Sequence, residues 1–203
     1  MIRAVIFDFG NVLVHFDPAY ITRQSAPTLS DADQALLTRV CFDRAYWDRL
    51  DRGDLDDADA ADAICLTLPA HLHPAVREIF DHWYRHLPEW DGMAELAAEW
   101  KQTGGKLYLL SNISRHFAAH SDEIPVLKSF DGKLMSGTVG IVKPTADIFR
   151  TLLTRFDLRA DECVFVDDAP RNIAGAVACG IDAILFTGDA DALRAEFVRR
   201  KML

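Results

Sequence analysis

The chain has 203 residues, of which 50% are hydrophobic and 26% are charged, and its formal net charge at pH 7 is -9. This length and composition can bury a substantial core, so we expect one globular domain or one domain with an insertion. The acidic balance argues against binding nucleic acid, which needs a surplus of Lys and Arg, and no apolar run approaches the length of a membrane span.

The amino terminus and the cysteines bear on the compartment. An acidic residue at position 8 comes too early for a secretory signal peptide. The four cysteines lie far apart without a C-x-x-C pair, so we expect reduced, mostly buried thiols rather than a zinc site or disulfides: Cys41, Cys65, Cys163 and Cys179. The sequence therefore predicts a cytoplasmic protein, either a monomer or a homodimer.

Four short apolar runs have the pattern of strands that are buried on both faces, at residues 3–7, 106–110, 163–166 and 183–186. Helices are predicted between the later runs, at residues 91–103, 144–156 and 170–179. The first of them begins at Asp91 as N-cap, and the other two begin at proline. Strands that alternate with helices form a parallel sheet, so the predicted fold class is α/β with a Rossmann-like parallel sheet.

Between the first strand and the helix at 91–103 lie residues without a convincing strand, but with helix starts at Ser30, Asp56 and His73. We interpret this stretch as an inserted all-helical cap over residues 17–88, which leaves residues 1–16 and 89–203 as the core domain. Three tryptophans of this region are expected to form the cap's own core: Trp47, Trp83 and Trp90.

An open parallel sheet binds its ligands beyond the carboxyl ends of its strands, and in this chain those ends are polar. The residues are Asp8 after the first run, Ser111 and Asn112 after the second, Asp167 and Asp168 after the third, and Lys143 before a helix. Each of these alone is common as a turn or cap. Together they offer carboxylates for a hard cation, a hydroxyl and an amide for phosphoryl oxygens, and an ammonium group. The combination predicts a site for phosphoryl transfer.

Four segments resemble the motifs of the haloacid dehalogenase-like hydrolases. They read Phe-Asp-Phe-Gly-Asn-Val-Leu at residues 7–13, Leu-Leu-Ser-Asn at 109–112, Val-Lys-Pro at 142–144 and Val-Phe-Val-Asp-Asp at 164–168. The resemblance runs from residue 2 to about residue 187 and includes a helical cap inserted after the first motif. The chain is most similar to the phosphatase subgroup whose first motif reads D-x-G-N, which includes bacterial sugar-phosphate phosphatases. The resemblance implies a magnesium-dependent phosphatase that acts on a small phosphorylated metabolite, with sugar phosphates among the candidates.

The resemblance also implies a role for each matching residue. Asp8 would be the nucleophile that forms an aspartyl-phosphate, and Ser111 and Lys143 would hold the phosphoryl group. Mg²⁺ would be bound by Asp8, by Asp168 and by the backbone carbonyl of Gly10, because this ion favours oxygen ligands. When bound, it would screen the repulsion between the carboxylate and the phosphate.

Residues beside these have supporting roles. Asp167 is predicted next to the metal, where it would orient a metal-bound water. Asn11, together with Gly10, would turn the chain so that backbone amides face phosphate oxygens, and Asn112 would contact a phosphoryl oxygen. Asn172 lies one helical turn beyond Asp168 and is either a positioning residue for that loop or a plain first-turn residue.

The first motif departs from most phosphatases of this family, which have a second aspartate two residues after the nucleophile, where this chain has Gly10. That aspartate protonates the leaving group, and a positioned general acid is worth roughly 10²- to 10⁴-fold in rate. One explanation is an acidic leaving group, such as an anomeric or aryl oxygen. Another is a substitute acid, for which His15 is the candidate, against a purely structural role for that histidine. A third is a protein that binds a phosphorylated metabolite without turnover.

A dehalogenase is a rival interpretation, because the related dehalogenases also lack the second aspartate. It is disfavoured, since those enzymes need no metal and lack an acidic pair such as Asp167 and Asp168.

The cap is expected to set the substrate. Candidate lining residues, each of which could instead be structural, are Asp17, Tyr20, Trp47 and Asp51. Arg115 and His116 follow the second motif closely, and they are expected either to approach the substrate or to lie at the surface.

Overall fold

A five-stranded parallel sheet forms the centre of the computed structural model, which describes residues 1–203. Its strands are β1 (Ala4–Phe7), β2 (Lys106–Ser111), β3 (Gly132–Met135), β4 (Cys163–Asp167) and β5 (Asp182–Leu185), in the spatial order β3-β2-β1-β4-β5. In the central register Phe7 lies opposite Leu109 and Val166. The carboxyl ends of β1, β2 and β4 therefore meet at one edge of the sheet.

The predicted α/β fold is confirmed, but the prediction of four strands missed β3. This strand reads Gly-Lys-Leu-Met, and only its last two residues are buried. It lies at the edge of the sheet, where one half of the strand remains accessible to water. An edge strand of this kind lacks the continuous apolar run by which the other strands were found.

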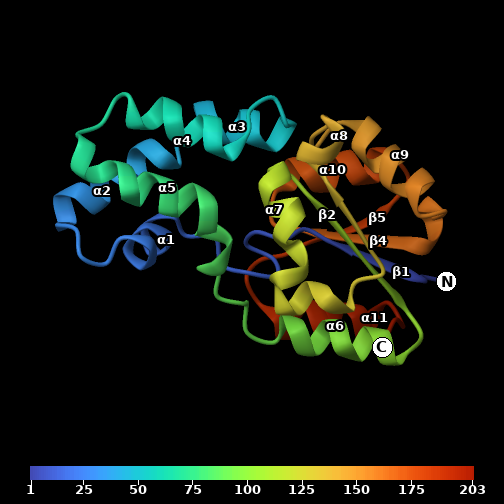
Figure 1. Ribbon diagram of the computed structural model, residues 1–203. Coiled ribbons are helices and arrows are strands. Elements are labelled where there is room, and N and C mark those ends of the chain that lie inside the picture. The colour runs from blue at the N-terminus through green and yellow to red at the C-terminus, as the bar shows by residue number, and fades with distance from the viewer.

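Helices cover both faces of the sheet (Figure 1). One face carries α9 (Ala146–Arg155) and α10 (Pro170–Ala178), and the other carries α6 (Met93–Gln102) and α11 (Ala190–Arg199). Successive side chains of a strand point to opposite faces, so Ile6 packs with the α9 side and Val5 with the α6 side. The three predicted core helices are present with shorter ends. The predicted N-cap of α6, Asp91, is wrong, because the N-cap is Gly92.

The helices α1 to α5 lie together beyond one end of the sheet (Figure 1). They are α1 (Pro18–Ser25), α2 (Asp31–Cys41), α3 (Arg44–Arg52), α4 (Asp57–Cys65) and α5 (His73–His82), with the short 3-10 helices η1 (Ala70–Leu72) and η2 (Trp83–Arg85). The predicted starts at Ser30, Asp56 and His73 correspond to α2, α4 and α5. We interpret this group as the cap.

Short helices complete the core side of the chain. They are α7 (Arg115–His120), η3 (Ser121–Glu123) and η4 (Pro125–Ser129) after β2, α8 (Ser136–Val139) after β3, and η5 (Ala160–Glu162) before β4. Of these, α7 and α8 lie at the carboxyl ends of β2 and β3. They are therefore the core elements nearest to the cap, and α8 contacts α3.

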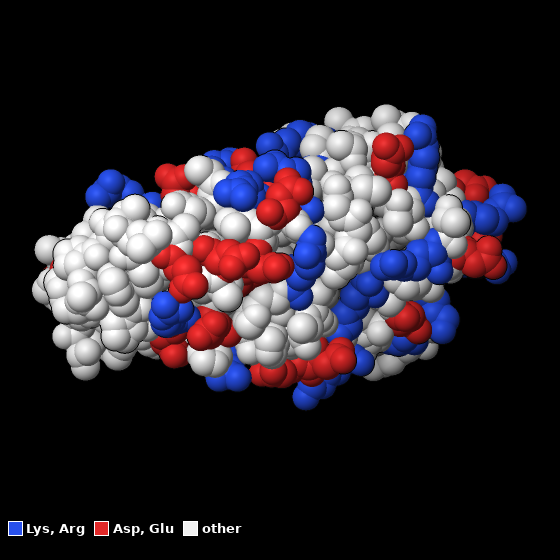
Figure 2. Space-filling model, turned by 45° about the horizontal axis from the view of Figure 1, so that its top comes forward, with Lys and Arg blue, Asp and Glu red and all other residues white.

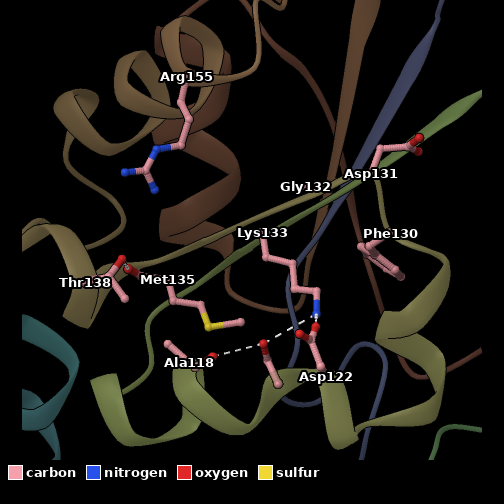
Figure 3. Close-up of a pocket in the computed structure, with 10 residues that line it drawn as sticks. Ala118, Asp122, Phe130, Asp131, Gly132, Lys133, Met135, Thr138 and Arg155 are labelled. Atoms are coloured by element: carbon pink, nitrogen blue, oxygen red, sulfur yellow. Dashed lines mark hydrogen bonds and ion pairs between the residues drawn. The ribbon is translucent and has the colours of Figure 1, made fainter.

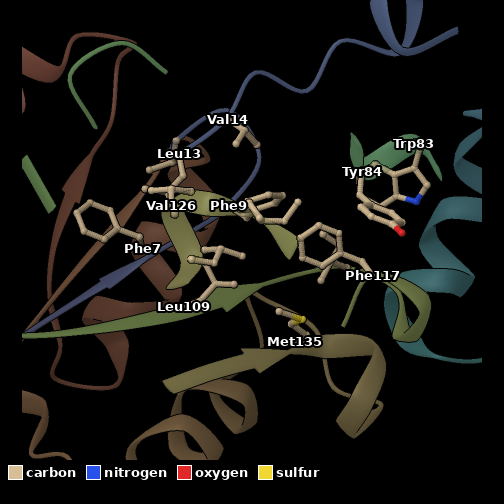
Figure 4. Close-up of a cluster of buried hydrophobic side chains, with 14 of the residues drawn as sticks. Phe7, Phe9, Leu13, Val14, Trp83, Tyr84, Leu109, Phe117, Val126 and Met135 are labelled. Atoms are coloured by element: carbon tan, nitrogen blue, oxygen red, sulfur yellow. The ribbon is translucent and has the colours of Figure 1, made fainter. Parts of the chain in front are cut away.

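Aromatic side chains join the cap to the sheet (Figure 4). The ring of Phe117 packs on Phe9 with centroids 4.8 Å apart, and on Trp83 of the cap at 5.5 Å. Trp83 in turn contacts Trp47 at 5.2 Å. The prediction that all three tryptophans form the cap core is wrong for Trp90. Its ring lies 5.4 Å from that of Phe186, which follows β5, so it belongs to the core side.

The surface is charged but mixed. Figure 2 shows one face on which groups of Lys and Arg lie among groups of Asp and Glu. No helix is both long enough and apolar enough to cross a lipid bilayer. All four cysteines are free thiols, and three of them are buried.

Candidate active site

A pocket of about 480 Å³ opens at the carboxyl ends of the strands, between the sheet and the cap. The core residues that line it come from the loops after β1, β2 and β4 and from the segment before α9. Seven of the eight predicted site residues line this pocket: Asp8, Gly10, Asn11, Ser111, Asn112, Lys143 and Asp168. The eighth, Asp167, is fully buried directly beside them. The topology of the sheet thus brings all four motifs to one place.

Lys143 is the charged centre of the site. Its ammonium nitrogen lies 2.8 Å from Oδ1 of Asp8 and 2.7 Å from Oδ2 of Asp167. Asp167 and Lys143 are buried, and the side chain of Asp8 is only 12% exposed. Oδ1 of Asp8 also accepts a hydrogen bond from the backbone N–H of Phe9, at 2.7 Å. Oδ2 of Asp8 accepts no hydrogen bond from the protein, so this oxygen is free to meet a ligand.

The burial of these groups changes their acidity. Burial raises the pKa of Asp8 to about 6, opposed by the charge of Lys143 and reinforced by that of Asp167. Burial alone would lower the pKa of Lys143, but the two carboxylates outweigh it and raise that pKa. Burial, with the nearby charge of Asp167, also raises the pKa of Asp168. The site therefore holds a permanent ammonium ion beside carboxylates that carry unbalanced negative charge.

The three carboxylates form a group that suits a hard cation. Oxygen atoms of Asp8, Asp167 and Asp168 all lie within 4.8 Å of one another. Asn172 adds a buried Oδ1 that has no hydrogen-bond partner and lies on the same pocket. Carboxylate and amide oxygens are the ligands that Mg²⁺ favours, whereas no sulfur or imidazole ligand is present in the group. The donor set fits Mg²⁺.

Asp167 differs from the other two carboxylates, because protein donors occupy it. Besides Lys143, its oxygens accept hydrogen bonds from Nδ2 of Asn172, at 2.9 and 3.0 Å, and from the backbone N–H of Ala169, at 2.8 Å. Asn172 therefore positions this loop, one of the two alternatives that the sequence left open. Asp168 makes no ion pair and is exposed, so its oxygens are accessible from the pocket.

Ser111 is the last residue of β2 and Asn112 follows it, but their side chains make different contacts. The hydroxyl of Ser111 lies on the pocket and makes no hydrogen bond to the protein. The amide of Asn112 is held by the backbone of Lys143, to whose carbonyl it donates at 3.0 Å and from whose N–H it accepts at 2.8 Å. Ser111 is thus available to a ligand, whereas the contacts of Asn112 fix the loop that carries Lys143.

The loop after Asp8 is shaped by Asn11, which has a φ of 58°. Asparagine tolerates this left-handed conformation better than most residues. Its Oδ1 accepts a hydrogen bond from the N–H of Phe16 at 3.2 Å, which closes the loop below the cap.

Several residues that the sequence offered as candidates do not reach the pocket. The ring of His15 stacks on Trp90 with centroids 3.8 Å apart, and His15 does not line the pocket, so it is not the substitute acid. Arg115 donates to the carbonyl of Gly53 and pairs with Asp56 at 3.6 Å, which ties the cap to the core. A ring nitrogen of His116 lies 2.9 Å from the carbonyl oxygen of Asp81.

The cap contributes a wall that the sequence predicted only in part. Of the four candidates, Trp47 and Asp51 line the pocket, whereas Asp17 caps α1 and Tyr20 does not reach it. The lining residues that were missed are Phe16, Phe42, Arg44, Asp48, Trp83 and Arg171, among others. Four of them come from the cap beyond residue 40, and no local pattern marks a side chain as facing another domain. The prediction of α3 could have suggested Arg44 and Asp48, since they share its exposed face with Asp51.

A second hollow of about 540 Å³ lies along β3, away from the motifs (Figure 3). Its basic side chain Lys133 is paired with Asp122 at 2.5 Å, and the nearby Asp131 is paired with Lys101 and Lys106. None of the predicted site residues lines it. Apart from Arg155, the charged side chains on this hollow are paired within the protein, so it offers less to an ionic ligand than the pocket at Asp8.

The family model of the haloacid dehalogenase-like hydrolases matches residues 2–180, and the chain belongs to that family. The chain is similar to the sesquiterpene phosphatase astK of Aspergillus oryzae, with 26% identity over 91% of this chain and 90% of that protein. It is also similar to the drimenol cyclase drtB of Aspergillus calidoustus, with 28% identity over 92% of this chain and 34% of that protein. The chain thus spans about a third of the length of the drimenol cyclase.

Solved structures share the fold over nearly the whole chain. A family enzyme from Bacteroides thetaiotaomicron in complex with magnesium and inorganic phosphate has a TM-score of 0.73 and 18% identity, over 95% of this chain and 99% of that chain. L-2-haloacid dehalogenase from Xanthobacter autotrophicus has a TM-score of 0.67 and 21% identity, over 100% of this chain and 85% of that chain. The fold is common to both, so the chemistry must be argued from the site.

Proposed function

We propose that this protein is a magnesium-dependent phosphatase that cleaves the phosphate monoester of a small metabolite through an aspartyl-phosphate on Asp8. One observation carries the proposal: a single pocket joins a carboxylate with a free oxygen, a buried ammonium ion and an unpaired hydroxyl. Two comparisons support it: the chain is similar in sequence to a sesquiterpene phosphatase, and similar in fold to an enzyme of the same family in complex with magnesium and inorganic phosphate.

Each core residue has a task in this reaction. Oδ2 of Asp8 attacks phosphorus, while Lys143 and the N–H of Phe9 hold Oδ1 and so fix the carboxylate. Lys143 and the hydroxyl of Ser111 lie where they can neutralise the phosphoryl oxygens. Asn112 and Asp167 hold Lys143 in place, through its backbone and its ammonium group respectively.

The residues that would hold Mg²⁺ are Asp8, Asp168 and the backbone carbonyl of Gly10, with Asp167 and Asn172 beside them. Bound there, the ion supplies positive charge that screens the approach of an anionic nucleophile to an anionic ester.

The cap wall suggests the class of alcohol. Aromatic rings of Phe16, Phe42, Trp47 and Trp83 line the pocket, and Arg44 and Arg171 lie on it as well. Rings bind apolar surfaces, including the C–H face of a sugar, and arginine binds anionic or polar oxygens. We therefore propose an ester whose organic part presents an apolar face next to polar groups. Sugar phosphates meet this description, as do aryl phosphates.

A phosphate-release screen of the purified protein tests the function. The panel contains sugar 1-phosphates, sugar 6-phosphates, aryl phosphates and prenyl phosphates, each with 5–10 mM Mg²⁺, about the range that saturates weak sites, and with EDTA. We expect release that requires Mg²⁺ and falls at least ~10³-fold in the Asp8→Asn variant, which keeps the shape of the side chain. Turnover that persists in Asp8→Asn would refute the aspartyl-phosphate.

A second candidate function is binding without turnover, which the glycine at position 10 favours. It predicts that inorganic phosphate binds while no ester in the panel is hydrolysed, and that Asp8→Asn leaves binding largely intact. The dehalogenase alternative predicts halide release from 2-haloacids without a metal. We do not favour a dehalogenase, because that reaction has no use for the acidic residues Asp167 and Asp168.

A further inference from the structure

Gly10 is a glycine for no steric reason. Its backbone is not left-handed, and a Cβ built on it would come no closer than 3.6 Å to another atom, the Cβ of Phe16. A Cβ at this position would therefore meet only an ordinary contact. With glycine here the core presents no proton donor two residues after Asp8, so a proton for the leaving group would come from another group on the pocket.

Two cap carboxyl groups share the pocket with Asp8, those of Asp48 and Asp51. The side chain of Asp48 is 48% exposed and pairs with Arg44 at 3.5 Å. Asp51 lies one turn further along α3, is partly buried, and makes neither an ion pair nor a side-chain hydrogen bond. Its carboxyl group is close enough to Asp8 and Lys143 for both of their charges to act on it. Asp51 is thus the free carboxyl group that the cap presents to the nucleophile.

The core fixes the end of α3 that carries Asp51. The hydroxyl of Ser136 donates to the carbonyl of Asp51 at 2.5 Å, and the guanidinium of Arg115 donates to the carbonyls of Gly53 and Gly137. Gly53 has a φ of 69°, and a Cβ there would lie 2.4 Å from the carbonyl oxygen of Gly137. These hydrogen bonds and the close approach of Gly53 to Gly137 anchor the end of the helix on the core. A group that transfers a proton needs such a support.

The electrostatics of the pocket suit proton exchange near neutral pH. Burial raises the pKa of Asp51 to about 7, reinforced by the charges of Asp48 and Asp8 and opposed by those of Lys143 and Arg44. The other charged side chains on the pocket are Asp168 and Arg171, and no histidine lines it. A general acid works best when its pKa lies near the working pH, because both of its protonation states are then accessible.

We propose that Asp51 is the general acid and base of the reaction, supplied by the cap in place of the aspartate that Gly10 replaces. This inference rests on the proposed phosphatase function. In the first step Oδ2 of Asp8 bonds to phosphorus, the ester P–O bond breaks, and the carboxyl proton of Asp51 passes to the leaving oxygen to give the alcohol. In the second step water attacks phosphorus, its proton passes to the carboxylate of Asp51, and the bond to Asp8 breaks to release inorganic phosphate.

The test compares leaving groups and variants. The substrates are 4-nitrophenyl phosphate and benzyl phosphate, which differ in the acidity of the leaving alcohol but both carry a ring. The variants are Asp51→Asn, Gly10→Asp, the double variant, and Asp54→Asn as control. Asp54 is an exposed carboxylate nearby that pairs with Arg52 at 2.9 Å and does not line the pocket.

We expect Asp51→Asn to lower kcat for benzyl phosphate by roughly 10²- to 10⁴-fold, the usual contribution of a general acid. With 4-nitrophenyl phosphate it should release a burst of about one equivalent of nitrophenol and then turn over slowly, because the second step lacks its base. Gly10→Asp should restore benzyl phosphate turnover in the Asp51→Asn background. Asp54→Asn should match the wild type.

Two results would overturn the role of Asp51: unchanged turnover of benzyl phosphate in Asp51→Asn, or equal losses on both substrates with no burst and no rescue. The second would mark a residue that only holds the cap. A wild-type protein that releases no phosphate from any ester, with or without Mg²⁺, would instead refute the phosphatase function itself and the role of Asp51 with it.

Discussion

Replacing Asp167 with asparagine should destabilise the fold, whereas the same change at its neighbour Asp168 should not. Asp167 is fully buried and forms an ion pair with Lys143, whose side chain is 1% exposed. Removing one partner of a buried pair costs roughly 3–5 kcal/mol, because the other charge is left in a medium that solvates it poorly. Lys143 keeps Asp8 at 2.8 Å, so we expect the lower end, about 3 kcal/mol.

That loss of stability can be measured as a fall in the melting temperature. For a chain of this size each kcal/mol corresponds to roughly 2–4 °C, so Asp167→Asn should melt about 6–12 °C below the wild type in EDTA at pH 7. Asp168 is exposed and has no ion-pair partner, and the partial burial of its carboxyl group, with the charge of Asp167, raises its pKa. Asp168→Asn should therefore stay within about 0.5 kcal/mol of the wild type.

The response to Mg²⁺ should distinguish the two variants in the opposite order, with the larger effect at Asp168. A ligand present at a hundred times its dissociation constant stabilises the folded protein by ~2.7 kcal/mol, so Mg²⁺ should raise the melting temperature of the wild type. Asp168→Asn should lose most of this rise, and Asp167→Asn should keep part of it. Equal melting temperatures for the two variants in EDTA, or an unaltered Mg²⁺ response in Asp168→Asn, would contradict the division of roles.

Three further predictions follow from single residues. Burial raises the pKa of Asp51 to about 7, so this group binds its proton more tightly in the folded than in the unfolded protein, and its contribution to stability falls as pH rises from about 4 to 7. Asp51→Asn removes this loss, so in chemical denaturation with EDTA its free energy of unfolding should gain on that of the wild type by up to ~4 kcal/mol across that window, and a constant difference would contradict the raised pKa. In chemical denaturation, Gly53→Ala should destabilise the protein by at least ~2 kcal/mol more than Gly104→Ala. Both glycines have positive φ, but only a Cβ at Gly53 would collide with Gly137, so equal losses would show that the backbone at Gly137 moves aside. Ser111→Ala should lower kcat by roughly 10²- to 10³-fold with little change in stability, as measured by steady-state kinetics beside thermal melts, and an unchanged kcat would remove the hydroxyl from the phosphoryl site.

The sheet and the motif residues could be predicted from the sequence because both are local. The strands β1, β2 and β4 are apolar runs that end in polar residues, and parallel topology requires those ends to lie together. The strand β3 could not be found in this way, because an edge strand that starts at Gly132 and Lys133 has no run of buried residues. Register and burial at an edge depend on the neighbouring strand, which a single segment does not encode.

The cap side of the site was beyond prediction for a related reason. The sequence suggested helices in residues 17–88 but not how they sit on the sheet, so Asp51 had no more weight than Asp17 or Tyr20. The contact that selects it joins Ser136 to the end of α3 across a large separation in sequence. His15 was the candidate for a substitute acid because it follows the loop after Asp8, with a structural role as the alternative, and its ring stacks on Trp90 outside the pocket. Nearness in sequence is a poor guide where a loop changes direction.

The charges of the core site also support the proposal that a cation binds there. Three carboxylates, those of Asp8, Asp167 and Asp168, gather around one ammonium group. Burial raises the pKa of both Asp8 and Asp168, and the negative charge of Asp167 adds to the rise. Lys143 pairs with Asp8 and Asp167 but makes no ion pair with Asp168. We infer that a divalent cation restores the balance, and that it keeps Asp8 ionised and nucleophilic at a pH where the metal-free site would partly protonate it.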